Sequence, residues 1–349
     1  MATKTQDINV QKIIPLPTPF ELRDTWPLTT HALQNVEYAR QAVQNILAGT
    51  DPRLLVVIGP CSIRNYEETL EYAMWFKKIT PLFPRFLLAM RVCPDKPRTT
   101  IGWPGFSDDP TMDGSHNVTE GLRETRRIFA AIADLGVPIA TEVFGPFTVR
   151  YISDAVSYGW IGARSVADSN HRKLASALSF PIGFKNTAEG SIAIAVDAVA
   201  TARHPHSFKG MNDDGRLSQV WGAGNQWGHI ILRGGVVPNY DAASIAVTQK
   251  LLEKIGGISA LVVDCAHSNS GKDAHKQVDV AQAVVAHRSV DRIAIVKGLM
   301  LESDLQTGRQ NIAPGTTYQR GVSVTDACLG IAETELLLSR LHAAYTIGG

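Results

Sequence analysis

The chain has 349 residues, with 34 Lys and Arg against 33 Asp and Glu, which gives a formal net charge of +1. A protein that coats nucleic acid or an anionic membrane needs a large basic excess, so this balance excludes both classes. No apolar run reaches the roughly 18 residues of a membrane helix, and no signal peptide is visible at the N-terminus. The four cysteines are too few for a disulfide framework in a chain this long. We therefore expect a soluble, cytoplasmic enzyme.

The first 50 residues predict an arm followed by a helix. Prolines at 15, 17, 19 and 27 punctuate the arm, and helical spacing of apolar residues extends over about 32–47. This segment precedes the first strongly apolar run and is not needed for the units that follow. We expect residues 1–50 to serve assembly or regulation.

From residue 51 onward, short β-branched apolar runs alternate with amphipathic stretches. The apolar runs predict eight strands, at 54–59, 86–92, 137–143, 160–163, 181–185, 229–232, 260–264 and 293–301. The stretches between them predict helices at 66–79, 120–135, 148–158, 170–177, 189–202, 242–255 and 278–286. A final helix is expected at 325–344, with Asp326 in its first turn.

Near-continuous apolar strands, each followed by a helix, are typical of a parallel sheet that is buried on both faces. Eight such units favour an α/β fold of the (β/α)8 TIM barrel type over residues 51–349. An open doubly wound sheet is the alternative that the pattern alone leaves standing. Residues 204–228, which contain Gly, Asn, Asp and Trp, predict a hairpin inserted before strand six.

The chemistry of such a barrel belongs at the C-terminal ends of its strands, where the loops converge. At or just after each predicted strand end stands a polar, charged or metal-binding residue: Cys61, Arg91, Glu142, Arg164, Lys185, Arg233, His267 and Glu302. A barrel without a catalytic role would carry Gly, Asn, Ser or Asp at many of these turns. The pattern therefore predicts an active site at this end.

Four of these residues are cations, and the sequence places two more close to them. The cations are Arg91, Arg164, Lys185 and Arg233, joined by Lys96 and Arg98 in a Lys-Pro-Arg-Thr-Thr run. So many cations facing one cavity repel one another unless a multiply charged anion lies among them. The predicted ligand is a small molecule with phosphate and carboxylate groups. The alternative is that each Arg pairs with an acid on the rim.

A second set carries metal-ligand chemistry. Cys61, His267 and Glu302, with Asp326 as a fourth candidate, offer one thiolate, one imidazole and two carboxylates. Such a set suits Mn²⁺, Fe²⁺, Co²⁺ or Zn²⁺. Spacing alone leaves two alternatives open, namely that Cys61 is a packed core thiol and that His267 is a general base.

The motifs at these strand ends together resemble a known family. They are Gly-Pro-Cys-Ser-Ile at 59–63, Lys-Pro-Arg-Thr-Thr at 96–100, Gly-Ala-Arg at 162–164, Gly-Phe-Lys-Asn at 183–186, Ile-Leu-Arg-Gly-Gly at 231–235, His-Ser-Asn at 267–269, Glu-Ser at 302–303 and Thr-Asp-Ala-Cys at 325–328. In this order they resemble the type I class of 3-deoxy-D-arabino-heptulosonate 7-phosphate (DAHP) synthases. The resemblance runs from about residue 30 to the C-terminus.

The resemblance implies a transferase that condenses phosphoenolpyruvate with erythrose 4-phosphate, the first step of the shikimate pathway. It implies a divalent metal, with Mn²⁺ favoured, and a homodimer or homotetramer. The implied metal ligands are Cys61, His267, Glu302 and Asp326. The implied phosphoenolpyruvate ligands are Arg91, Lys96, Arg164, Lys185 and Arg233. Arg98 and Thr99 would bind the sugar phosphate, and Glu142 would lie near the attacking water. Lys96 would donate a proton to the new oxygen, and His171 would support the catalytic residues without contacting the substrates.

The sequence departs from the family pattern at several loop positions. Arg64-Asn65 replaces the usual His-Asp after the cysteine motif, and Pro104 stands where Lys is common. Gly145 and Val149 replace the Asp and Pro that members inhibited by phenylalanine or tyrosine carry. An aromatic amino acid is the effector class that the resemblance implies. Because of these two changes, we expect feedback inhibition to be absent or shifted to another effector such as tryptophan.

Three rival functions remain to be weighed. The sister condensation with arabinose 5-phosphate is disfavoured, because those enzymes look shorter and lack Lys-Pro-Arg-Thr-Thr. A catalytically retired barrel that binds a partner should have lost a ligand or a phosphate-binding Arg, and none is lost. Nucleic-acid binding has no support beyond the cations at the strand ends.

Overall fold

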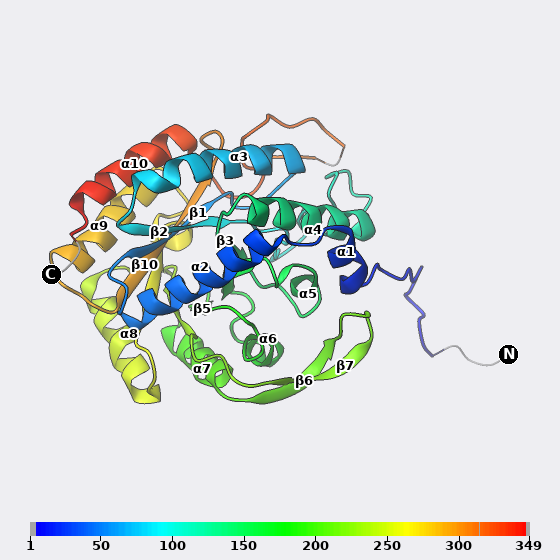
Figure 1. The fold of residues 1–349 in the computed structure, drawn as a ribbon, viewed down its shortest axis with the longest axis horizontal. Coiled ribbons are helices and arrows are strands. Elements are labelled where there is room, and N and C mark those ends of the chain that lie inside the picture. Colours follow the sequence, from blue (N-terminus) through cyan, green and yellow to red (C-terminus); the bar gives the residue numbers. More distant parts are fainter. Residues whose placement is uncertain (1–4, 314, 347–349) are drawn as a thin grey trace.

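The computed structural model describes residues 5–313 and 315–346. Its centre is a closed barrel of parallel strands in the order β1-β2-β3-β4-β5-β8-β9-β10, closed by pairing of β10 with β1 (Figure 1). These strands are β1 Leu54–Gly59, β2 Phe86–Arg91, β3 Ile139–Glu142, β4 Val156–Ile161, β5 Ile182–Lys185, β8 His229–Leu232, β9 Leu261–Asp264 and β10 Val296–Asp304. The short strand β11, Leu329–Gly330, adds to β10. The prediction of a TIM barrel is confirmed.

Helices pack around the outside of the barrel and connect successive strands. They are α3 Tyr66–Ile79, α4 Val118–Asp134, α5 Thr148–Ile152, α6 Ser169–Ala175, α7 Ile192–Arg203, α8 Ala242–Ile255, α9 Gln277–Ser289 and α10 Ile331–Ala344, with 3-10 turns η1 Thr80–Leu82 and η2 His267–Asn269. The ends of α3 show why such segments are helical. Asn65 caps its N-terminus by accepting from the Glu68 amide, and Lys77 and Lys78 lie in its last turn, where cations are favoured. No helix in the described ranges is long and apolar enough to cross a membrane.

The predicted helix at 148–158 is wrong in its second half. Helix α5 ends at Ile152, and strand β4 begins at Val156. Val156 pairs with Ile139 of β3, and Tyr158 is fully buried. Ladder pairing with β3 and burial of both faces therefore outweigh the helical spacing that continues through this stretch.

The predicted helix at 325–344 begins too early. Helix α10 starts at Ile331, because the side chain of Glu333 accepts from the Gly330 amide and caps the helix there. Asp326 consequently lies in the loop before β11 and not in a first helical turn. This loop turns Asp326 toward Cys61, whose Sγ is 3.7 Å from Asp326 Oδ2.

The N-terminal region closes one end of the barrel. It contains α1 Pro19–Thr25 and α2 Thr30–Ala48, and Figure 1 shows α2 lying across the barrel end. Val43, Ile46 and Leu47 of α2 belong to the same buried cluster as barrel-interior residues such as Val57 and Met300. This apolar packing covers the N-terminal end of the barrel and leaves the C-terminal ends of the strands for a ligand site.

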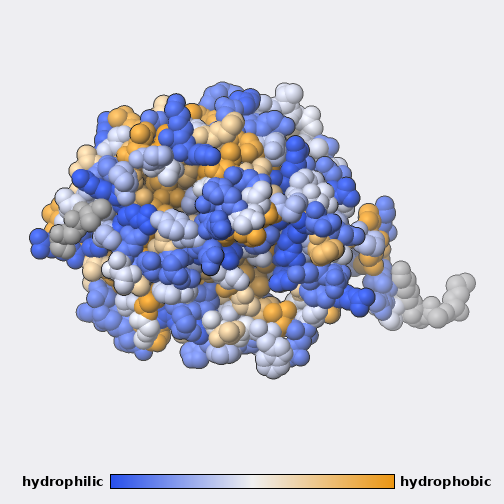
Figure 2. Space-filling view, viewed as in Figure 1, coloured by the Kyte–Doolittle hydropathy of each residue, from blue (hydrophilic) through white to orange (hydrophobic). Residues whose placement is uncertain are grey.

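An antiparallel hairpin of β6 His206–Met211 and β7 Leu217–Gly222 stands between α7 and β8. Its outer side is apolar in part, since Leu217 and Trp221 are 78% and 76% exposed. The N-terminal segment also projects from the body and exposes Ile13 (Figure 1). On the face of the molecule seen in Figure 2, hydrophobic residues lie among hydrophilic ones.

His229, at the start of β8, makes the stability of the barrel depend on pH. Its Nδ1 is 2.9 Å from the Trp227 carbonyl oxygen and its Nε2 is 2.8 Å from the Tyr158 hydroxyl. A carbonyl only accepts, so Nδ1 carries the proton and Nε2 accepts from Tyr158. Burial of the ring lowers the pKa of His229 to about 4.

We expect this histidine to destabilise the fold as the pH falls from about 6.5 to about 4, because only the unfolded chain takes up the proton there. At pH 5 the loss is about 2 kcal/mol relative to neutral pH. Urea unfolding of the wild type and of His229→Gln at pH 7.5 and pH 5 measures it, since Gln does not titrate. An equal pH dependence in the two proteins would contradict the assignment.

Candidate active site

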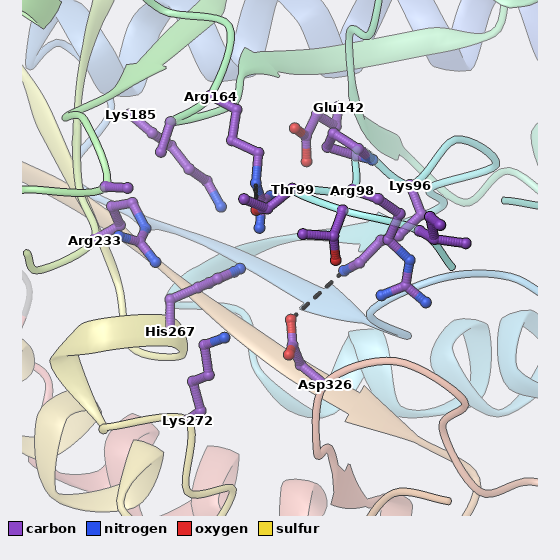
Figure 3. A pocket seen from close by; sticks show the side chains of 16 residues that line it. Lys96, Arg98, Thr99, Glu142, Arg164, Lys185, Arg233, His267, Lys272 and Asp326 are labelled. Atoms are coloured by element: carbon purple, nitrogen blue, oxygen red, sulfur yellow. Dashed lines mark hydrogen bonds and ion pairs between the residues drawn. The ribbon is translucent and has the colours of Figure 1, made fainter. Parts of the chain in front are cut away.

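The C-terminal ends of the barrel strands surround a cavity of about 260 Å³ (Figure 3). Nine residues identified from the sequence line it: Lys96, Arg98, Thr99, Glu142, Arg164, Lys185, Arg233, His267 and Asp326. They come from the last residues of seven different strands or from the loops that follow them, because parallel strands bring their carboxyl ends to one edge. Lys and Arg side chains outnumber carboxylates on its wall six to two.

Two of the candidate cations are held in buried ion pairs: Lys185, which lines the cavity, and Arg91, which does not. Arg91 Nη2 lies 3.0 Å from Glu302 Oε1, and Lys185 Nζ lies 2.7 Å from Asp264 Oδ2. Both cations also lie over the ring of Trp160, at 5.1 and 5.5 Å from its centroid. Arg91 and Lys185 each pair with an acid, although both acids are buried and do not lie on the rim, and these ion pairs fix the two cations in place.

The remaining cations on the wall are differently placed. In the described part of the chain, Arg98, Arg164, Arg233 and Lys272 have no carboxylate within 4.0 Å. Arg164 Nε donates to Thr99 Oγ1 at 3.0 Å, and Arg98 Nε donates to the Trp103 carbonyl at 2.9 Å. These hydrogen bonds orient the guanidinium groups without neutralising them. Positive charge that is held in place and left unpaired suits a multiply charged anion.

The sequence analysis missed Lys272 and Asp264. Lys272 lines the cavity from the loop after η2, where its φ is 63° and its amide donates to the His267 carbonyl at 2.7 Å. Asp264 is the fully buried last residue of β9. Asp264 could have been predicted, because it is an acidic residue at the end of an apolar strand. Nothing in the spacing pointed to Lys272, whose left-handed backbone turns it back over the site.

Three side chains beneath the cavity form a group suited to a metal. One ligand atom each from Cys61, Glu302 and Asp326 lies within 4.8 Å of the others. Cys61 and Glu302 are each 1% exposed. Burial raises the pKa of the Cys61 thiol to about 12, and nearby Glu302 adds to this shift. A cation among these groups is needed to hold the sulfur as a thiolate.

A protein cation already lies next to this triad. Lys96 Nζ is 2.7 Å from Cys61 Sγ and 3.6 Å from Asp326 Oδ2. Although burial opposes it, Lys96 holds the pKa of Asp326 down at about 2. Cys61 and Glu302 in turn raise the pKa of Lys96 against the effect of burial, so the ammonium stays protonated. Positive charge is thus favoured at this point, and a thiolate with two carboxylates suits a borderline divalent ion.

His267 lies at the edge of the triad and not within it. Its Nε2 is 3.8 Å from Glu302 Oε1, and its Nδ1 is 2.9 Å from Asp264 Oδ2 without hydrogen-bond alignment. The backbone of His267 is left-handed, with φ 55°. The nitrogen that faces Glu302 is therefore the one available as a fourth ligand atom, while Asp264 faces the other.

Glu142 and His171 occupy different layers of the site. Glu142 lines the cavity, and its Oε2 accepts from Trp160 Nε1 at 3.3 Å. Gly162 leaves room for it, since a Cβ there would lie 2.0 Å from Glu142 Oε1. His171 does not line the cavity: its Nδ1 bonds to Asp168, and its Nε2 accepts from the Gly145 amide at 3.1 Å. It therefore supports the loop that follows Glu142.

Comparison with known proteins places the chain among related sequences and structures. The model of the DAHP synthetase I family matches residues 30–339. The Tyr-sensitive phospho-2-dehydro-3-deoxyheptonate aldolase of Escherichia coli is 43% identical over 94% of this chain and 92% of the relative. The Phe-sensitive enzyme of that organism is 40% identical over 99% and 98%. The solved structure of the Francisella tularensis SCHU S4 aldolase has a TM-score of 0.93 and 37% identity, covering 97% of this chain and 99% of that chain.

Proposed function

The chain belongs to the DAHP synthetase I family and is a transferase, a 3-deoxy-7-phosphoheptulonate synthase, and on this premise we propose that it condenses phosphoenolpyruvate with erythrose 4-phosphate in a metal-dependent reaction. C3 of phosphoenolpyruvate forms a bond to the sugar aldehyde carbon, water adds at C2, and the C2–O bond to phosphate breaks. The products are DAHP and phosphate. The observation that carries the proposal is a cavity lined by four cations without a carboxylate partner among the described residues, next to the Cys61, Glu302 and Asp326 triad.

The cations divide the work of binding phosphoenolpyruvate. Arg164 and Arg233, which have no acid partner among the described residues, provide planar forks for its phosphate and carboxylate. Lys185 and Arg91, fixed by Asp264 and Glu302, supply a positive floor that needs no reorganisation during the reaction. Together with Lys96, these groups hold C3 toward the second substrate.

The remaining candidates act on the sugar and on the water. Arg98 and Thr99 bind the phosphate of erythrose 4-phosphate, and Lys96, held protonated beside Cys61, donates a proton to the new alkoxide. Glu142 lies against the water that adds to C2. His171 acts as a positioning residue, because it contacts the loop after Glu142 through the Gly145 amide and the Phe144 ring and does not line the cavity.

The metal is held by Cys61, Glu302 and Asp326, with His267 as the fourth ligand, and Mn²⁺ is the favoured ion over Fe²⁺, Co²⁺ and Zn²⁺. When bound, the metal supplies Lewis-acid polarisation of the sugar aldehyde. The donor set of sulfur, nitrogen and carboxylate oxygen supports this assignment.

The deciding experiment measures phosphate release from phosphoenolpyruvate by chelator-stripped protein, before and after Mn²⁺ is added. Erythrose 4-phosphate is the expected co-substrate, and arabinose 5-phosphate is the matched control. We expect turnover only with the four-carbon sugar and the metal. Turnover with arabinose 5-phosphate would favour the sister reaction, and bound metal without turnover would favour a partner-binding barrel.

The proposed function includes regulation by an aromatic amino acid and assembly into a homo-oligomer. The relatives named as Tyr-sensitive, Trp-sensitive and Phe-sensitive support an aromatic amino acid as effector, which is tested by adding each to the assay. Gly145 and Val149 are the positions at which we expect its identity to be altered. Residues 1–50 and the hairpin at about 204–228 are assigned to assembly of a homodimer or homotetramer in the cytoplasm. The exposed Leu217 and Trp221 support an interface there.

A further inference from the structure

The segment 318–328 carries Asp326 to the triad without a helix or strand of its own among its described residues. It lies between β10, which ends at Asp304, and β11, into which it leads directly. A ligand residue on an irregular segment binds a metal tightly only if other contacts hold that segment in place. The contacts that do so begin at Arg64.

Arg64 is the centre of a buried ionic cluster. Its side chain is 2% exposed, and its two terminal nitrogens lie 2.5 and 3.0 Å from the oxygens of Asp304. Its Nη2 also lies 2.7 Å from Glu68 Oε2. Burial alone would lower the pKa of Arg64, but the two carboxylates raise it. The guanidinium therefore fixes Glu68, at the start of α3, against Asp304 at the end of β10.

Glu68 in turn accepts hydrogen bonds from the segment 318–328. Its Oε2 accepts from the Gly321 amide at 2.9 Å, and its Oε1 accepts from the Tyr318 hydroxyl at 2.9 Å. Asn65, which precedes α3, donates to both Glu68 and Tyr318. Every one of these bonds ends on a carboxylate, a hydroxyl or an amide within the cluster, and none reaches the cavity. The cluster therefore clamps two points of the segment to the N-terminus of α3.

A short buried chain of hydroxyl groups leads from the clamp to the triad. The Thr325 amide donates to Ser323 Oγ at 3.2 Å, and Thr325 Oγ1 lies 3.0 Å from Ser62 Oγ. Ser62 directly follows Cys61, and Thr325 directly precedes Asp326. This side-chain bond therefore links the residues next to two triad members, Cys61 and Asp326.

From this geometry we propose that Arg64 is a positioning residue for the metal site, acting through Glu68 on the segment 318–328. It fixes the clamp, the clamp fixes residues 318–321, and the segment then holds Asp326 facing Cys61 and Glu302. The inference rests on the proposed function in one respect, which is that the triad binds a divalent metal. A merely structural cluster would contribute stability without altering metal affinity.

The test compares two single-residue changes in the same segment. Tyr318→Phe removes the hydroxyl that bonds to Glu68 but keeps the ring. Arg320→Gln removes an exposed ion pair with Glu71, in the same stretch of chain, and leaves the bonds to Glu68 intact. Mn²⁺ affinity of chelator-stripped protein is measured by titration calorimetry. We expect Tyr318→Phe to weaken Mn²⁺ binding about tenfold and Arg320→Gln to leave it unchanged, with both free energies of unfolding near that of the wild type.

A second variant and a second readout keep the test decisive. Glu68→Ala removes both ties and should weaken Mn²⁺ binding more than Tyr318→Phe does. Trypsin should cleave after Arg320 faster in Tyr318→Phe and in Glu68→Ala than in the wild type. Bound Mn²⁺ should slow this cleavage. Wild-type affinity and cleavage in Tyr318→Phe would overturn the inference. Mn²⁺ binding without turnover would overturn only the proposed function, whereas a wild type that binds none of the four candidate ions would overturn both.

Discussion

Replacing Cys61 by alanine is expected to weaken Mn²⁺ binding by more than about 100-fold, since loss of a mere outer-shell partner of a metal ligand already costs 10- to 100-fold. Cys61 is the only sulfur of the triad, and it accepts from Lys96 Nζ at 2.7 Å. Its loss also leaves Lys96 without that partner, so phosphate release should fall by about three orders of magnitude at metal concentrations that saturate the wild type.

Cys93→Ala is the matched control for this result. Cys93 is also a buried thiol near the end of β2, but it does not belong to the triad. Titration calorimetry with Mn²⁺ and the phosphate-release assay are applied to both variants. Cys61→Ala with Mn²⁺ affinity within about threefold of the wild type would remove the thiolate from the metal site and return Cys61 to the role of a packed core residue.

Arg164→Ala is expected to raise the KM for phosphoenolpyruvate by at least about 30-fold, which corresponds to about 2 kcal/mol of lost charge-assisted binding. Arg164 is exposed toward the cavity and has no acid partner among the described residues, so no buried carboxylate is left uncompensated. The free energy of unfolding should therefore stay within about 0.5 kcal/mol of the wild type.

Arg172→Ala should show the opposite pattern. The Arg172 guanidinium donates to the carbonyls of Val166 and Ile194 and does not line the cavity. Steady-state kinetics and urea unfolding should give an unchanged KM and lower stability for this variant. Arg164→Lys should recover part of the affinity, because it keeps the charge and loses the planar fork. An unchanged KM in Arg164→Ala would exclude Arg164 from the phosphoenolpyruvate site.

Most residues of the candidate site could be predicted from the sequence, because charged and metal-binding residues stand at or just after the ends of apolar strands. Arg91 and Lys185 are the last residues of β2 and β5, and Glu302 lies two residues before the end of β10, so the strand periodicity located them. Asp326 lies in an irregular loop, and its helical prediction was wrong. Lys272 was missed because its position depends on a left-handed turn after η2 and not on any strand end.

The sequence by itself determined the alternation of strands and helices and the chemistry at the strand ends, because both are local: apolar periodicity sets each element, and parallel strands bring their carboxyl ends together. Only the tertiary structure decided which cations are paired, which stay free, and what holds Asp326 in place. The Arg64 bond to Asp304 joins residues 240 positions apart, and α2 seals a barrel end whose residues come from distant strands. Contacts between residues so far apart in the sequence depend on how the helices and strands pack against one another, and local sequence patterns do not predict that packing.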